Sequence, residues 1–165
     1  QVYTLKKALQ KSGYSLSGSE PLKITIAAKP YGYRGTDLAE ILIRQGLVPE
    51  FADADYLVLM LTPETGREGL DRLERVLIQI PPKAAIEDDA PTLQPAVQVM
   101  SIREAMLSCS EVIPVSGSLG RILAVPTVGC PPAVPIVACG ERIDSHAIDC
   151  FHYYGIRECC VVKER

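Results

Sequence analysis

The 165-residue sequence predicts an α/β (α+β) fold with two small lobes, each a short sheet packed by helices. Three observations lead to this prediction. In the first half, segments with the apolar spacing of a helix alternate with segments that have the spacing of a strand. A polar, proline-rich and aperiodic stretch follows, and after it a second series of helix-capping and β-like signals begins. The sequence therefore predicts one small domain over 1–82, a linker over 83–96 and another domain over 97–165.

The first lobe is expected to contain three helices and two strands. The helices are expected over 1–12, 36–46 and 66–80, and the strands over 21–28 and 56–61. The second strand, YLVLML, is apolar throughout, which is typical of a strand buried on both faces. Thr65 and Glu68 have the spacing of a capping box for the last helix. That helix has an apolar stripe made of Leu70, Leu73, Leu77 and Ile80.

The second lobe is expected to mix short helices with short strands. Ser101 and Glu104 have the spacing of a capping box, and Asp144 is expected to cap a later helix that turns Ile148 and Phe151 inward. The expected elements are a helix from 102, a short helix near 115–119, β-like runs over 123–129 and 134–139, a helix over 145–154 and a strand over 158–163.

Composition excludes several classes of function. Hydrophobic content of 47%, charged content of 22% and a net charge of −3 are ordinary for a soluble globular domain. Without a basic block, we expect no nucleic-acid partner, and the short apolar runs predict no membrane span. The chain begins with a helix-like segment rather than a signal peptide, which favours a cytoplasmic protein, and its first residue, Gln1, suggests a piece of a longer polypeptide.

The six cysteines are expected to be reduced and mostly buried, because a secreted disulfide scaffold is usually smaller and poorer in core residues. They are Cys109, Cys130, Cys139, Cys150, Cys159 and Cys160. The last two are adjacent in a strand-like segment and should therefore point to opposite faces. A zinc site would need ligands at CxxC or HxxxH spacing, and since neither spacing occurs, we expect no metal.

Three positions are candidates for chemistry, each with a structural alternative. Glu111 and Arg121 bracket a turn and can form an ion pair that pins it, although Glu111 could instead face a substrate. Glu141 can bind backbone N–H groups or cap a helix, or it can line an entrance that attracts a cationic substrate. Cys130 could be a nucleophile only in an electropositive, partly open setting, and no base lies near it in sequence.

An ordered series of residues then points to a family. Residues 101–143 read SIREAMLSCSEVIPVSGSLGRILAVPTVGCPPAVPIVACGERI. This segment resembles the C-terminal region of bacterial ornithine/lysine/arginine decarboxylases, which carries the order SE…P…GR…PP…P…GE. The matching positions are Ser110, Glu111, Pro114, Gly120, Arg121, Pro131, Pro132, Pro135, Gly140 and Glu141. The sequence departs from the family at Cys130, where a tyrosine is frequent, at Ala133, which replaces a glycine, and at Cys139, which replaces a proline.

The first half, LKITI followed by GYRGTDLAEILIRQGLVPEFADADYLVLMLTPETGREGLDRL, resembles the small domain of the same group, which are fold-type I pyridoxal-phosphate enzymes. The resemblance implies a parent carbon–carbon lyase that decarboxylates a basic amino acid, as in polyamine metabolism. In that family the cofactor is bound by a lysine in a Ser-x-His-Lys context, in a large domain that precedes this region. No lysine here has that context, so the chain is expected to hold no cofactor, to contribute no catalytic residue and to be inactive alone.

The resemblance further implies that the chain packs on the large pyridoxal-phosphate domain, shapes the active-site entrance and contributes to a homodimer or other self-association. The candidate entrance or interface residues are Glu111, Arg121, Cys130, Pro131, Pro132 and Glu141. A free-standing interaction or regulatory module derived from the same fold is the alternative, and a small enzyme that uses Cys130 is a third possibility. The choice among lysine, arginine and ornithine stays open.

Overall fold

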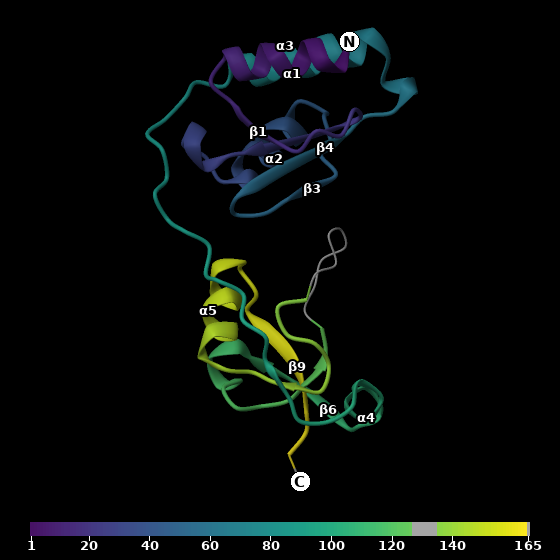
Figure 1. Cartoon of the computed structure of the whole chain (residues 1–165), viewed down its shortest axis with the longest axis vertical. Coiled ribbons are helices and arrows are strands. Elements are labelled where there is room, and N and C mark those ends of the chain that lie inside the picture. Colours follow the sequence, from purple (N-terminus) through teal and green to yellow (C-terminus); the bar gives the residue numbers. More distant parts are fainter. Residues whose placement is uncertain (127–134, 165) are drawn as a thin grey trace. The chain divides into compact units, whose positions relative to one another are not determined.

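The structure, a computed structural model, describes residues 1–126 and 135–164 (Figure 1). It confirms a mixed α/β architecture with helices packed on small antiparallel sheets. The chain divides into two compact units, Gln1–Asp88 and Asp89–Arg165, and the division falls inside the stretch 83–96. Within the described part of the chain, every helix is too short or too polar to cross a membrane.

Unit 1 contains a four-stranded antiparallel sheet with the strand order β1-β2-β4-β3. Its elements are α1 (Val2–Lys11), β1 (Ser15–Ser17), β2 (Lys23–Ala27), α2 (Gly35–Arg44), β3 (Phe51–Ala52), β4 (Tyr56–Met60) and α3 (Gly66–Gln79). The three helices and the two longer strands confirm the expectations from sequence, whereas β1 and β3 had not been expected. Both missed strands have only two or three residues, too few to show an alternation of apolar and polar side chains.

The helices of unit 1 bury their apolar stripes against one face of this sheet. Ile24 and Ile26 of β2 and Leu57 and Leu59 of β4 belong to one core cluster, which also contains the expected α3 stripe of Leu70, Leu73, Leu77 and Ile80. The helices α1 and α3 lie side by side over the sheet (Figure 1). This packing accounts for the amphipathic spacing of the helices, since one side of each faces the core.

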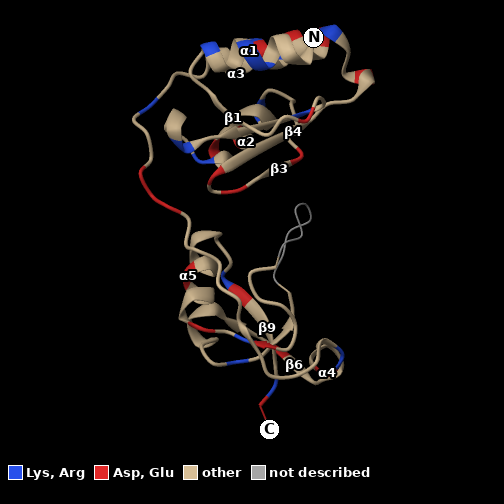
Figure 2. Ribbon diagram, in the orientation of Figure 1, with Lys and Arg blue, Asp and Glu red and all other residues tan. Residues whose placement is uncertain are grey.

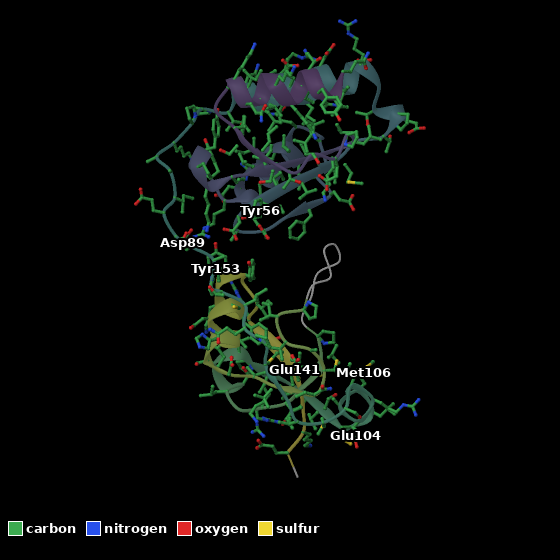
Figure 3. The ribbon with its side chains drawn as sticks, viewed as in Figure 1. Tyr56, Asp89, Glu104, Met106, Glu141 and Tyr153 are labelled. Atoms are coloured by element: carbon green, nitrogen blue, oxygen red, sulfur yellow. The ribbon has the colours of Figure 1, made fainter. Side chains whose placement is uncertain are left out.

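The opposite face of the sheet is open, which corrects the expectation that β4 is buried on both faces. Leu57 and Leu59 are buried, but Tyr56 and Met60 are exposed and Val58 between them is half-buried. In Figure 3, Tyr56 lies on the side of the sheet away from α1 and α3. The strand is apolar throughout although only one of its faces belongs to the core, so β4 presents Tyr56, Val58 and Met60 to the surroundings of unit 1, beside Lys23 and Thr25 of β2.

The start of α3 differs from the expected capping box. Thr65 makes no side-chain cap on α3, and Glu68 does not complete a box with it. Instead, Thr62 and Thr65 bracket a 3-10 turn, Pro63–Thr65, in which the Thr62 N–H donates to Thr65 Oγ1 at 3.1 Å. The helix then begins at Gly66, whose φ of +60° lies in a region that favours glycine. The Thr65 hydroxyl therefore accepts from the backbone of the turn before α3 and does not cap α3 itself.

Three stacked tyrosines close the other end of α3. The rings of Tyr14 and Tyr31 lie 4.0 Å apart between centroids, and Tyr33 follows at 6.3 Å from Tyr31. Their hydroxyls donate to three carbonyl oxygens at the end of α3 and just after it: Tyr14 to Leu77 at 2.8 Å, Tyr31 to Ile80 at 2.9 Å and Tyr33 to Pro81 at 2.8 Å. This tyrosine ladder therefore supplies donors at a helix end, where the last carbonyls lack intrahelical partners, and the hydroxyls of Tyr14 and Tyr31 do so in a buried setting.

Unit 2 is built on a three-stranded antiparallel sheet, β6-β9-β7, with a separate two-stranded pair, β5-β8. Its elements are β5 (Val97–Gln98), α4 (Ile102–Leu107), β6 (Ser110–Pro114), β7 (Leu123–Val125), β8 (Glu141–Arg142), α5 (Ser145–Tyr153) and β9 (Glu158–Val162). The helix expected near 115–119 is a 3-10 turn, Val115–Gly117. Residues 135–139 form bends and a turn rather than a strand.

The caps expected in unit 2 are present. The Glu104 N–H donates to Ser101 Oγ at 3.2 Å and the Ser101 N–H donates to Glu104 Oε2 at 2.9 Å, which completes the capping box of α4. Asp144 accepts from the Ala147 N–H at 2.8 Å and starts α5. Phe151 of α5 is fully buried in the core of unit 2, as expected, and Ile148 packs against the same core.

Candidate functional site

The candidate residues Glu111 and Arg121 form the ion pair that their positions predicted. Glu111 lies on β6, and Arg121 follows the 3-10 turn that begins at Val115. Arg121 Nη2 is 2.7 Å from Glu111 Oε1 and also donates to the Val162 carbonyl of β9 at 3.0 Å. Its Nε lies 3.3 Å from Glu164 Oε1. The guanidinium therefore fastens the turn to the end of β9.

Arg121 is held as a cation by these contacts. Only 15% of its side chain is exposed, and the hydrogen bond that it donates to Glu111 raises the pKa of the guanidinium above its ordinary value, with Glu164 adding to the effect. The Glu111 carboxylate is at the same time occupied by its partner. This arrangement stabilises the turn, and it gives Glu111 a structural partner instead of a free position toward a substrate.

Glu141 turns back onto its own loop. Its carboxylate accepts from the Ala138 N–H at 2.7 Å, which is the backbone-binding alternative expected for this residue, and the side chain is half-buried (Figure 3). Gly140 beside it has a φ of +86°, and a Cβ at this position would collide with the Met100 carbonyl oxygen. Gly140 and Glu141 therefore form a tight turn at which the start of β8 lies close to the backbone before α4.

The remaining candidates, Cys130, Pro131 and Pro132, lie in 127–134, outside the described residues. Of the other cysteines, Cys139, Cys150 and Cys159 are buried, Cys160 is half-buried and Cys109 is exposed, and all five are free thiols. Burial raises the pKa of the Cys139, Cys150 and Cys159 thiols. A raised pKa keeps a thiol neutral, and a neutral thiol is a poor nucleophile.

A charged cluster in unit 1 was not expected from the sequence. Lys29, which is 8% exposed, lies 2.7 Å from Asp55 Oδ1 and 2.5 Å from Asp88 Oδ1, and its ammonium also donates to the Asp88 carbonyl at 2.6 Å. Arg34 Nη2 donates to the other oxygen of Asp88 at 2.6 Å. Arg34 thus holds a carboxylate of its own chain.

This charged cluster fastens the segment after α3 to unit 1. The Lys83 N–H donates to the Tyr31 carbonyl at 3.1 Å and the Ile86 N–H donates to the Lys29 carbonyl at 3.1 Å. The hydrogen bond from Lys29, followed by that from Arg34, lowers the pKa of Asp88. Residues 83–88, expected as linker, therefore pack on unit 1. Lys29 and Asp88 are 59 residues apart, so no local spacing could have revealed their contact.

Two lysines of the described chain are engaged in contacts of their own. A Schiff-base lysine must offer its amine to an aldehyde. Lys29 is buried, and its ammonium lies between the carboxylates of Asp55 and Asp88. Lys83 lies over the Tyr33 ring at 4.0 Å from its centroid. In the described part of the chain, no group of three or more His, Cys, Asp or Glu could hold a metal ion.

The sequence is similar to two curated enzymes from bacilli, while no protein-family profile matches it. It is 28% identical over 145 residues to an arginine decarboxylase of Bacillus subtilis, covering 84% of this chain. It is 30% identical over 138 residues to an arginine decarboxylase of Halalkalibacterium halodurans, covering 75% of this chain. The chain spans only 29% and 27% of the length of these two relatives.

Solved structures show the same fold. The constitutive lysine decarboxylase of E. coli matches 87% of this chain with a TM-score of 0.60 and 16% identity. The Francisella novicida lysine decarboxylase LdcF matches 90% of it with a TM-score of 0.62 and 14% identity. In each case the match covers 32% of the decarboxylase chain.

These matches show that the chain has the fold of, and is similar to, one part of longer chains that are named decarboxylases. More particularly, they confirm its resemblance to the C-terminal region of the ornithine/lysine/arginine decarboxylases.

Proposed function

We propose that this chain serves as the C-terminal portion of a pyridoxal-phosphate-dependent decarboxylase of ornithine, lysine or arginine. In this role it packs on a large catalytic domain, helps to shape the active-site entrance and contributes to a homodimer, and it has no activity alone. The observation that carries the proposal is the match of most of this chain to little more than a quarter of two arginine decarboxylases. A region with this relationship works as part of a larger enzyme.

The proposed division of labour agrees with the side chains. Pyridoxal phosphate, when bound, supplies the electron sink for decarboxylation. The residues of this chain supply none of the groups that bind the cofactor by the family's motif, because no lysine lies in a Ser-x-His-Lys context. We therefore assign the cofactor to the large domain, and we assign Glu111, Arg121 and Glu141 to the scaffold near the entrance rather than to the chemistry.

The open sheet face of unit 1 is the surface that we assign to contact with the large domain. Tyr56 and Met60 are exposed there with Val58 between them, opposite the face that α1 and α3 cover. An apolar surface of this kind favours association, because burying it removes apolar area from water. The same surface would promote self-association when the large domain is absent.

The direct test combines gene sequence and activity. The coding sequence upstream of Gln1 is expected to encode a domain with a Ser-x-His-Lys motif, and co-expression of that domain with this chain should yield decarboxylation of lysine, arginine or ornithine. The isolated chain should release no CO₂ from any of the three. Activity of the isolated chain would contradict the proposal.

The sheet face can be tested with paired variants. Met60→Lys places a charge on the open sheet face and should weaken co-purification with the large domain, whereas Ile43→Lys changes an equally exposed apolar residue on α2 and should not. Equal loss in both variants would show that this face is not the contact surface. A gene that encodes only these residues behind its own start codon would favour the alternative, a free-standing interaction or regulatory module.

A further inference from the structure

A small cavity in unit 2 lies beside the Arg121 ion pair. It has a volume of about 230 Å³ and is lined by Gly120, Arg121, Ile122, Arg142, Val162, Lys163 and Glu164. Backbone contacts fix its walls, because Ile122 bridges to Arg142 and the Val162 N–H donates to the Ile122 carbonyl at 2.8 Å. The Lys163 N–H donates to the Cys109 carbonyl at 2.8 Å. The lining residues are thus held by three separate segments of the chain.

The lining carries more positive than negative charge. Arg121, Arg142 and Lys163 contribute three cations, and Glu164 contributes the single carboxylate of the lining. Within residues 1–126 and 135–164, Arg142 and Lys163 take part in no ion pair, whereas Arg121 is paired with Glu111 and Glu164. The excess of positive charge in this cavity contrasts with the net charge of the whole chain, which is −3.

Arg142 and Lys163 retain donors for a ligand. Arg142 Nη1 donates to the Gly120 carbonyl at 3.2 Å, which anchors the guanidinium at the cavity and uses one of its five N–H groups. The Lys163 ammonium carries three further donors. Both residues belong to the lining of one cavity, and guanidinium and ammonium groups are the donors that proteins use to bind phosphate.

Glu164 occupies part of this basic environment in the structure. Its carboxylate lies 3.3 Å from Arg121 Nε, yet 77% of the side chain is exposed, so it can move away at little cost. Arg142 and Lys163 form no ion pair with the described residues, and Glu111 balances Arg121, so departure of Glu164 would remove the last carboxylate of the lining and leave two positive charges in excess there. Two uncompensated cations match the charge of a phosphate dianion. The volume also lies below the range of about 300–1,000 Å³ that is usual for whole organic ligands.

We propose that this cavity binds a phosphate group through Arg142 and Lys163, and that Glu164 is the internal carboxylate which the ligand displaces. The site is separate from the function proposed above and does not depend on it. Free inorganic phosphate and the phosphate of a nucleoside monophosphate present the same chemistry to these residues, so the experiment includes both.

The test is a titration of the whole 165-residue chain with inorganic phosphate at neutral pH, with chloride added to hold the ionic strength constant. Amide NMR shifts should saturate at Gly120, Ile122 and Lys163. Arg142→Gln should weaken binding about fivefold through loss of charge-assisted hydrogen bonds. Arg103→Gln removes the same charge from exposed α4, away from the cavity, and should leave the affinity unchanged.

Glu164→Gln provides a test with the opposite sign. Removal of the competing carboxylate should tighten phosphate binding about threefold. The matched control is Glu158→Gln, which neutralises an exposed carboxylate at the other end of β9 and should have no effect. Since both variants change exposed side chains, neither should impair folding, and a circular dichroism spectrum checks this.

The proposal fails if phosphate causes no saturable shifts, if Arg103→Gln weakens binding as much as Arg142→Gln, or if Glu164→Gln does not tighten it. Adenosine monophosphate distinguishes the sources of the phosphate group. Tighter binding of adenosine monophosphate than of inorganic phosphate would support a nucleotide ligand, and equal or weaker binding would support the free ion.

Discussion

The two units of this chain are both small α/β folds, but different contacts stabilise them. Unit 1 has a large apolar core under its helices. The tyrosine ladder binds the end of α3, and the charged cluster around Lys29 holds the segment 83–88 in place. Unit 2 has a smaller core and depends on tight backbone corners and the ion pair of Arg121. Both units carry the charges of their ion pairs on loops and strand ends as well as on helices (Figure 2).

This difference teaches where each unit is vulnerable. In unit 1 the polar contacts join residues that are far apart in sequence, so one change affects the docking of a whole segment. In unit 2 the contacts of Ser101 and Glu141 span three residues each, so a change there affects a local turn, and Arg121 is the residue that joins its turn to the distant end of β9. The following predictions test this contrast, beginning with the largest expected effect.

The largest effect is expected from the cores. Phe151→Ala should lower the free energy of unfolding of unit 2 by about 3–5 kcal/mol, since it removes a fully buried ring and leaves a cavity. Leu77→Ala should destabilise unit 1 by about 2–5 kcal/mol for the same reason. Denaturant unfolding followed by circular dichroism should show each variant shifting the transition of its own unit. A single transition that shifts equally in both variants would show that the units do not unfold independently.

The next effect is expected at the Gly140 corner. Gly140→Ala should destabilise unit 2 by about 2 kcal/mol or more, because the φ of +86° disfavours a side chain and the new Cβ would meet the Met100 carbonyl. Gly155 is the matched control, since its φ is +72° but no atom lies within 4 Å of a Cβ there. Gly155→Ala should therefore cost only about 1 kcal/mol. Equal losses in thermal unfolding would rule out the collision as a cause.

The tyrosine ladder comes third. Tyr31→Phe should lower the stability of unit 1 by about 1–3 kcal/mol, because the Ile80 carbonyl loses its donor in a buried setting. Tyr3→Phe removes the hydroxyl of an exposed tyrosine on α1 and should change stability by less than about 0.5 kcal/mol. Denaturant midpoints of the two variants provide the comparison. No loss for Tyr31→Phe would mean that water replaces the hydroxyl.

A smaller effect is expected at the capping box of α4. Ser101→Ala should destabilise unit 2 by about 1 kcal/mol, since the Glu104 N–H loses its acceptor. Ser116→Ala changes an exposed serine of the 3-10 turn and is the control. Thermal unfolding monitored by circular dichroism measures both. A loss in the control as large as that in Ser101→Ala would contradict a specific capping role.

The smallest effect at neutral pH is expected from the charged cluster, where Asp88 is 40% exposed. Its pKa is lowered from the ordinary 3.8 by Lys29 and Arg34, so its contribution to stability is fully present above that value and is lost as the pH falls through the lower folded-state pKa. Asp88→Asn should therefore flatten the loss of stability of unit 1 in the acid range below about pH 4. Asp89→Asn, one residue further along the chain, is the control. Identical acid titrations of stability for Asp88→Asn and the unmodified chain would contradict this role.

The sequence was informative wherever a signal is local. The apolar stripe of α3 repeats with the helical period and consists of Leu70, Leu73, Leu77 and Ile80. Such a repeat is expected for any helix that buries one face, whatever it packs against. The Glu111–Arg121 ion pair could be predicted from the sequence for a similar reason, because the two residues bracket a single turn. The short strands β1 and β3 gave no such signal, since their pairing with longer strands, and not their own composition, makes them strands.

Two expectations were wrong for different physical reasons. The run YLVLML was expected to be buried on both faces, but an apolar composition does not reveal whether a second layer is present in the chain. Thr65 and Glu68 had the spacing of a capping box, but Pro63 starts a 3-10 turn in which the Thr65 hydroxyl accepts from the Thr62 N–H instead of capping α3. Within the candidate site, the cluster of Lys29, Asp55 and Asp88 depends on the docking of a distant segment and has no sequence signal.

The tyrosine ladder also has an optical consequence. The chain has seven tyrosines, two weakly absorbing phenylalanines and no tryptophan, so its near-ultraviolet absorption and emission come chiefly from phenol rings. The stacked rings of unit 1 give that unit an intrinsic reporter of its native state. Burial and the neighbouring Tyr31 raise the pKa of Tyr14 far above its ordinary value. Alkaline titration of phenolate absorbance should therefore show this ring ionising only when unit 1 unfolds, so that its transition can be followed without a label.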